Sequence, residues 1–243
     1  MKFLLTIIWV LVWSMTYSQE NTPAVQDQIV NQIGKDGYAG AVQTYDTRYE
    51  GVKGTPFLSE KWQPGSFTYN NGTSHDKVSL RYDMYRDELW VRTKRNREVI
   101  IFQNRLESFV LDSVAENASD RFIKVRYIPH LANYLEPESM VQILYEGKFM
   151  VVARRKKIMR KASYKGGYSL NRTYDEFVEI DPEYYSIYES RKVVRVKPSE
   201  KAFLRKFPTY SDAIKSYLNK YNPDFLNPDE VGVLFRQITQ TDE

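Results

Sequence analysis

The segment Val78-Ser79-Leu80-Arg81-Tyr82-Asp83-Met84 sets the pattern for the middle of the chain, with apolar residues at even numbers and polar residues at odd numbers. Because successive side chains of a strand point to opposite faces of a sheet, this alternation predicts a strand with one buried and one solvated face. Arg86-Asp87-Glu88 indicates a turn into a second strand over 89–93. The two segments together predict a β-hairpin.

Short segments of the same kind continue to about residue 196, and turn-forming residues separate most of them. The further strands are expected at 98–102, 108–111, 122–127, 141–145, 148–154, 176–180 and 193–197. Gly147 lies between two runs rich in β-branched residues, which is typical of a tight hairpin. Successive antiparallel strands at this spacing predict a β meander, either as a curved sheet or as a half-open barrel that buries its dry face.

The two ends of the chain carry helical periodicity instead. Val25, Ile29, Val30 and Ile33 fall on one helical face, which predicts an N-terminal helix. At the other end, Ser199 is placed to cap a short helix that stops before Pro208.

Two more helices are expected near the C-terminus. Ile214, Tyr217, Leu218 and Tyr221 recur at helical spacing. Asn227-Pro228-Asp229-Glu230 combines a cap, a first-turn proline and acids at the positive end of a helix dipole. The apolar stripe of this helix is expected to comprise Val231, Leu234, Phe235 and Ile238. The predicted class is therefore α+β, mainly an antiparallel meander with an N-terminal helix and two to three short C-terminal helices. The sheet domain is expected over 19–198 and the helical segment packed on it over 199–243.

Residues 1–18 have the three parts of a secretory signal peptide. Lys2 is followed by an apolar run from Phe3 to Trp13 and then by Thr16-Tyr17-Ser18. An uncleaved anchor is the alternative, but the run is shorter than the roughly 20 residues that cross a bilayer. We expect cleavage after Ser18, no remaining transmembrane span, and a location in the periplasm or at the periphery of the outer membrane.

Composition narrows the possible functions. The chain has no cysteine among its 243 residues, which excludes disulfide bonds and a lipid-modified N-terminal cysteine. The formal net charge of +4 is too small to indicate a nucleic-acid partner.

Catalytic and metal-binding motifs are scarce. The two histidines, His75 and His130, have neither triad-like nor zinc-ligand surroundings in the sequence. There is no G-x-S-x-G, no P-loop and no acidic calcium loop. We therefore expect no metal, no cofactor and no enzymatic activity. A glycan hydrolase remains an alternative, because paired carboxylates could come from Asp87, Glu88, Asp112, Glu136, Glu138 and Asp181.

A dense basic segment directly follows the apolar strand that ends near Ala153. It consists of Arg154, Arg155, Lys156, Lys157, Arg160 and Lys161. Such a segment is a candidate contact surface for an envelope protein or for an anionic lipid or glycan surface. The alternative is an edge strand that its charges protect from aggregation. The 19 tyrosines allow a similar choice, between sugar-stacking platforms and ordinary strand packing.

Three segments carry a resemblance to a known group of proteins. They are Tyr49-Glu50-Gly51-Val52-Lys53-Gly54-Thr55-Pro56-Phe57-Leu58 with Trp62 and Gly65 after it, Leu144-Tyr145-Glu146-Gly147-Lys148, and Phe207-Pro208. The chain resembles uncharacterised exported proteins of Bacteroidetes-type Gram-negative bacteria. This resemblance implies a turn-rich entry, a β meander and closing helices, and no known activity. The expected function is a non-enzymatic binding or accessory module of the envelope, with a carrier of a lipid or other apolar ligand as the alternative.

Overall fold

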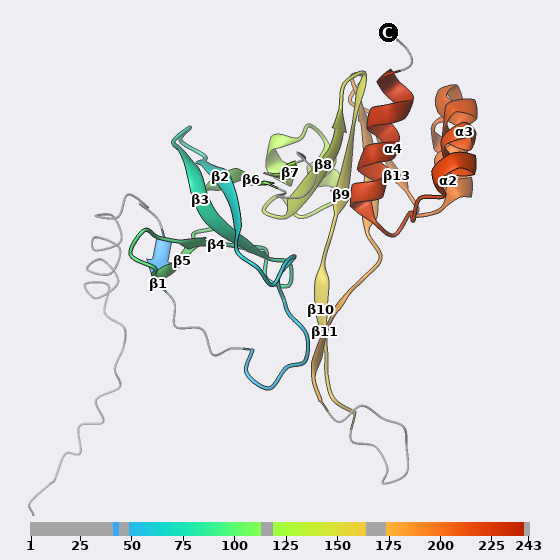
Figure 1. Ribbon diagram of the computed structural model, residues 1–243. Helices are drawn as coiled ribbons and strands as arrows, with labels where there is room; N and C mark the ends of the chain where they lie inside the picture. The colour runs from blue at the N-terminus through green and yellow to red at the C-terminus, as the bar shows by residue number, and fades with distance from the viewer. Residues whose placement is uncertain (1–40, 44–48, 113–118, 164–173, 241–243) are drawn as a thin grey trace, which may run out of the picture.

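The computed structural model describes residues 41–43, 49–112, 119–163 and 174–240. The predicted signal peptide over 1–18 and the predicted helix around residues 25–33 lie outside the described residues. Figure 1 shows an extended antiparallel sheet with three helices at its C-terminal end.

The main sheet has eleven strands in the order β1-β5-β4-β3-β2-β6-β7-β8-β9-β12-β13, and it is open, with β1 and β13 at its two ends. The pairing of β2 with β6 joins an N-terminal half, β1 to β5, to a C-terminal half that begins with β6. Every pair of neighbouring strands is antiparallel, as the alternation predicts. The strands are β1 Ala41–Gln43, β2 Gln63–Tyr69, β3 Ser74–Asp83, β4 Glu88–Arg92, β5 Glu98–Ile101, β6 Leu106–Asp112, β7 Ser119–Lys124, β8 Met140–Glu146, β9 Phe149–Arg154, β12 Glu183–Tyr188 and β13 Val193–Val196.

The interior of the N-terminal half is filled by side chains. Leu80 and Tyr82 of β3 are at most 1% exposed, and Val91 of β4 is fully buried with them. The rings of Phe109 and Phe122 stack with their centroids 4.6 Å apart, and the Tyr82 ring packs against both. The predicted inward face of β3 is confirmed, and among the described residues it faces packed rings.

The second, smaller sheet is a two-stranded ribbon that leaves the main sheet. β10 (Lys157–Arg160) continues from β9, and β11 (Glu176–Glu179) returns into β12. In Figure 1 this ribbon projects away from the main sheet, and the segment that leads into β2 runs beside it. A parallel bridge between Lys53 and Glu176 fixes that segment to β11.

The three C-terminal helices are α2 (Glu200–Lys206), α3 (Ser211–Tyr221) and α4 (Pro228–Gln240). Helix α4 packs on β8. Its predicted apolar stripe is buried at 0–4% exposure and comprises Val231, Leu234, Phe235 and Ile238. Pro208 begins a short 3₁₀ turn, η3 (Pro208–Tyr210), so α2 ends before it as expected. None of the described helices is long and apolar enough to cross a membrane.

The prediction of a strand over 122–127 is wrong in its second half. β7 ends at Lys124, and the 3₁₀ turns η1 (Val125–Tyr127) and η2 (Leu131–Asn133) follow. These turns bury Val125, Ile128 and Leu131 against the sheet face opposite the helices. The strand β12 was not predicted, because its central residues are buried on both faces and therefore show no alternation.

Candidate ligand-binding pocket

Arg154 stands at the end of β9, where the basic segment begins, and its side chain is 10% exposed. Its Nη2 donates to Oδ2 of Asp87 at 2.5 Å. Its Nη1 donates to the backbone oxygens of Met140 at 3.3 Å and Arg155 at 2.8 Å. Because Asp87 belongs to the turn between β3 and β4, this ion pair links the two halves of the sheet.

Asp87 is held in turn by its own half of the sheet. Its backbone has φ 60°, in the left-handed region that Asp and Asn tolerate better than most residues. Tyr82 donates its phenol hydrogen to Oδ1 of Asp87. Burial raises the pKa of Tyr82 well above its usual range, and the Asp87 carboxylate raises it further, so the phenol stays a donor at neutral pH.

A second buried cation lies nearby. Lys124, at the end of β7, has a side chain only 2% exposed, and its Nζ donates to Glu138 at 2.6 Å. Arg126 pairs with the same carboxylate. Burial lowers the pKa of Lys124 to about 8 and Arg126 lowers it further, whereas Asp87 opposes the shift. Together, Arg154, Lys124 and Asp87 form a buried charged junction, which the partly exposed Glu138 joins through Lys124.

A pocket of about 430 Å³ opens beside this junction, and we call it the Tyr134 pocket. One wall is the segment 132–139, which begins within η2 and which we call the η2 segment. The other wall is formed by the two connections from β9 to β10 and from β11 to β12. The larger side chains that line the pocket include those of Tyr134, Glu136, Arg154, Lys156, Ile180, Asp181 and Glu183. Since Arg154 is fixed by Asp87, one wall of the pocket is preorganised.

Two large apolar side chains of the pocket wall are exposed. Tyr134 is 53% exposed and Ile180 is 36% exposed. The Tyr134 ring rests against Tyr185 of β12, with centroids 6.1 Å apart and the planes at 57°. A tyrosine ring that packs against the protein on one side and is exposed on the other can stack against a ligand.

The charged groups of the pocket fall into two sets. Arg154 is neutralised by Asp87, and Glu183 pairs with Arg195. The other three, Glu136, Lys156 and Asp181, are exposed, and within the described part of the chain their side chains have no ion pair. The pocket therefore presents two uncompensated carboxylates and one uncompensated ammonium beside an aromatic ring.

The structure separates the six residues of the predicted basic surface. Besides Arg154, Arg155 faces the helices, where its guanidinium bonds Glu179 at 3.1 Å and lies 3.6 Å from Asp229 of α4. Lys157 donates to the backbone oxygens of Thr55 and Phe57 at 3.1 and 2.5 Å. Three of the six basic side chains are therefore engaged by partners within the fold.

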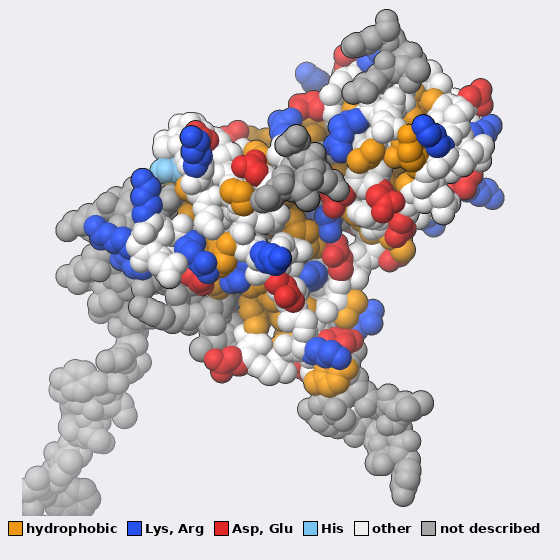
Figure 2. Space-filling model, viewed as in Figure 1, with side chains coloured by type: hydrophobic (Ala, Val, Ile, Leu, Met, Phe, Trp, Pro, Cys, Tyr) orange, Lys and Arg blue, Asp and Glu red, His pale blue; other side chains and the backbone are white. Residues whose placement is uncertain are grey.

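The remaining three basic residues are exposed. Lys156 lines the pocket, Arg160 lies on β10, and Lys161 is 70% exposed while it pairs with Asp175 at 2.9 Å. On the face seen in Figure 2, Lys and Arg side chains are interspersed with Asp and Glu. The prediction of a contact surface stays a prediction for Lys156, Arg160 and Lys161.

The residues considered for catalysis are dispersed, with one exception. His75 lies on the β2–β3 hairpin and stacks on Phe67 with ring centroids 4.9 Å apart. His130 directly precedes η2 and has φ 62°. Within the described ranges, no group of three His, Cys, Asp or Glu side chains could hold a metal ion. The exception concerns Glu136 and Asp181, which line the same pocket.

Searches against protein-family models, curated proteins and solved structures gave no match. Tyr134 and Ile180 were not singled out from the sequence, because each lies in a short irregular segment whose position relative to the other depends on the fold.

Proposed function

We propose that this protein is a non-enzymatic binding module of a bacterial envelope and that it holds a glycan in the Tyr134 pocket. The observation that carries the proposal is the pairing of an open aromatic ring with charged and polar groups in one hollow. A sugar ring has an apolar face of C–H groups and a rim of hydroxyls. Tyr134 suits the face, and Glu136, Asp181 and Lys156 suit the rim.

The rigidity of the site supports the same proposal. Binding costs less when the contacting groups are already held in place. Arg154 is fixed by Asp87 and by two backbone carbonyls. The Tyr134 ring packs against the Tyr185 ring. The Tyr134 ring and the Arg154 wall therefore need little ordering when a ligand enters.

The test is binding of purified protein to a panel of envelope and capsular oligosaccharides, followed by calorimetry on those that bind. Tyr134→Ala should weaken binding of an oligosaccharide that binds the natural protein by about fivefold, since an aromatic stacking contact contributes on the order of 1 kcal/mol. Tyr127→Ala is the matched control, because Tyr127 is 38% exposed on η1 and does not line the pocket. Absence of binding across the panel, or equal losses in the two variants, would refute the proposal.

Export to the envelope is a separate part of the proposal. It is supported by the three-part pattern of residues 1–18 and not by any residue of the pocket. Fractionation of expressing cells should place the protein outside the cytoplasm, and N-terminal sequencing should begin at Gln19. A cytoplasmic product that keeps Met1 would overturn the export assignment.

A second candidate, a glycan hydrolase, is favoured by one specific observation. Glu136 and Asp181, two of the acids considered from the sequence, line the same pocket. Glycosidases need two carboxyl groups flanking the bond that breaks. Release of reducing ends from a bound oligosaccharide, lost in both Glu136→Gln and Asp181→Asn, would establish this activity in place of simple binding.

The carrier alternative draws no support from the described residues. An apolar carrier needs a dry cavity, but Leu80, Tyr82 and Val91 are buried in a filled core. The Tyr134 pocket is lined largely by polar and charged side chains. Native mass spectrometry of the purified protein should therefore find no retained lipid.

A further inference from the structure

We infer that the glycan in the Tyr134 pocket carries a free primary amine, as a glucosamine-containing oligosaccharide does. This inference rests on the proposed function and narrows it to one class of ligand.

The balance favours a positive group in the ligand. Of the pocket's five charged side chains, Arg154 and Glu183 are already compensated by Asp87 and Arg195. Glu136 and Asp181 face one remaining cation, Lys156, so the open part of the pocket has an excess of one negative charge. An ammonium group in the ligand would remove that excess.

The aromatic ring favours the same group. A cation within about 6 Å of an aromatic face is attracted to it, and the attraction grows when carboxylates lie beside the ring. Tyr134 is the most exposed large hydrophobic residue of the pocket. It also shares the η2 segment with Glu136, two residues further along the chain. Ring and carboxylate therefore come from one short element that is fixed against β12 through Tyr185.

The buried junction behind the pocket does not cancel this excess at the ring. Lys124 and Arg126 share Glu138, and none of these three side chains lines the pocket. Their net charge of plus one therefore acts on a bound ligand from farther away than the side chains that line the pocket. The charged groups of the pocket wall that have no ion-pair partner among the described residues are Glu136, Lys156 and Asp181.

The experiment compares glucosamine oligomers with N-acetylated oligomers of the same length, by calorimetry at pH 6 and two salt concentrations. The free amine should bind about tenfold more tightly, and this advantage should shrink as salt rises, because exposed charges are screened. Glu136→Gln and Asp181→Asn should each reduce the advantage. Lys156→Gln should increase it, since it removes the competing cation.

Asp212→Asn is the control variant, because Asp212 is 98% exposed on α3 and lies outside the pocket. Equal affinity for the two oligomers, unchanged in Glu136→Gln, would overturn the amine inference and leave glycan binding intact. Equally tight binding of an oligolysine peptide would overturn the assignment to a glycan. Failure of every oligosaccharide to bind would instead count against the proposed function itself.

Discussion

Arg154 and Asp87 form an ion pair with Nη2 and Oδ2 at 2.5 Å, and they connect β9 to the turn between β3 and β4. Their side chains are 10% and 14% exposed, so both charges are largely removed from water. Tyr82 completes the arrangement by donating to Asp87 from the core of the N-terminal half. The pair thus holds one wall of the Tyr134 pocket to the opposite half of the sheet.

Asp87→Asn should destabilise the protein by about 3–5 kcal/mol, because loss of one partner leaves a buried charge uncompensated. Asparagine keeps the left-handed backbone at this position, so the change isolates the charge. Urea denaturation followed by circular dichroism measures the loss.

The control for Asp87 is an exposed pair of similar length. Arg121 and Glu146 are 2.8 Å apart, with side chains 54% and 52% exposed. Glu146→Gln should cost less than about 1 kcal/mol, because water solvates both charges when the pair is broken. Similar losses in the two variants would show that the junction contributes no more than a surface contact.

Lys124 should give the protein a distinctive alkaline pH dependence. Its pKa is about 8 in the folded protein, against 10.5 as the ordinary value, and burial is the main cause. Between these two values the unfolded chain holds a proton that the folded chain has released, so raising the pH through this window stabilises the folded state. Below pH 8 both states are protonated and the contribution is constant.

The measurement compares the natural protein with Lys124→Met, whose side chain keeps the length without the charge. From pH 8 to 9.5, the natural protein should gain stability relative to the variant by up to about 1.4 kcal/mol per pH unit. A difference between the two proteins that stays flat over this range would contradict the lowered pKa.

The sequence predicts the sheet better than it predicts the pocket. Alternation in 78–84 and the stripe from Val231 to Ile238 report burial on one face of an element, and both are confirmed. Trp90 shows where this reasoning stops. Its alternation with Leu89 and Val91 predicts a position on the wet face of β4. Trp90 is nevertheless 2% exposed, because Phe57 packs on it edge-on with ring centroids 5.3 Å apart.

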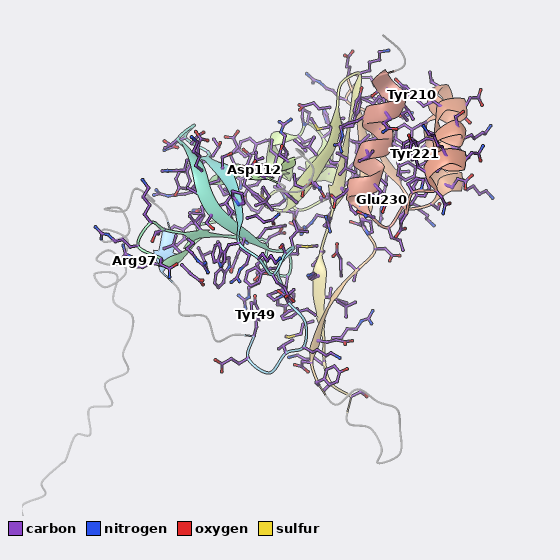
Figure 3. The ribbon with its side chains drawn as sticks, in the orientation of Figure 1. Tyr49, Arg97, Asp112, Tyr210, Tyr221 and Glu230 are labelled. Carbon is purple, nitrogen blue, oxygen red and sulfur yellow. The ribbon has the colours of Figure 1, made fainter. Side chains whose placement is uncertain are left out.

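Contacts between distant segments explain the remaining differences. Arg81 lies over the Phe57 ring at 3.7 Å and over the Trp62 ring at 4.7 Å, so the segment before β2 covers this side of the sheet. Tyr49, labelled in Figure 3, continues that cover and donates to Asp83 at 2.6 Å. The sequence pattern of β4 alone cannot predict burial that is caused by residues of another segment.

The helix caps provide a matched pair of variants, because the sequence predicts a cap at both Ser199 and Asn227. In the structure, Asn227 Oδ1 accepts from the Asp229 N–H at 3.1 Å, and its amide donates to Glu230 at 2.9 Å. The Ser199 hydroxyl makes no capping bond to α2. Asn227→Ala should therefore cost about 1 kcal/mol and Ser199→Ala much less, as measured by thermal unfolding. The reverse order would show that these contacts do not set the stability of the helix starts.

Gly65 lies where the two halves of the sheet meet, and Gly232 in α4 serves as its control. A Cβ on Gly65 would lie 2.1 Å from the backbone oxygen of Val110, where β2 pairs with β6. A Cβ on Gly232 in α4 would have its nearest neighbour, a guanidinium nitrogen of Arg236, at 3.4 Å. Because the Val110 oxygen belongs to the backbone, it moves only if the strand moves. The Arg236 side chain, in contrast, is flexible.

Gly65→Ala should therefore destabilise the protein by about 1–3 kcal/mol or more through overpacking. Gly232→Ala should be neutral or should stabilise it by up to about 1 kcal/mol, because alanine favours a helix over glycine. Chemical denaturation of the two variants beside the natural protein separates these outcomes. If Gly65→Ala unfolded at the same denaturant concentration as the natural protein, β2 and β6 would be farther apart than described.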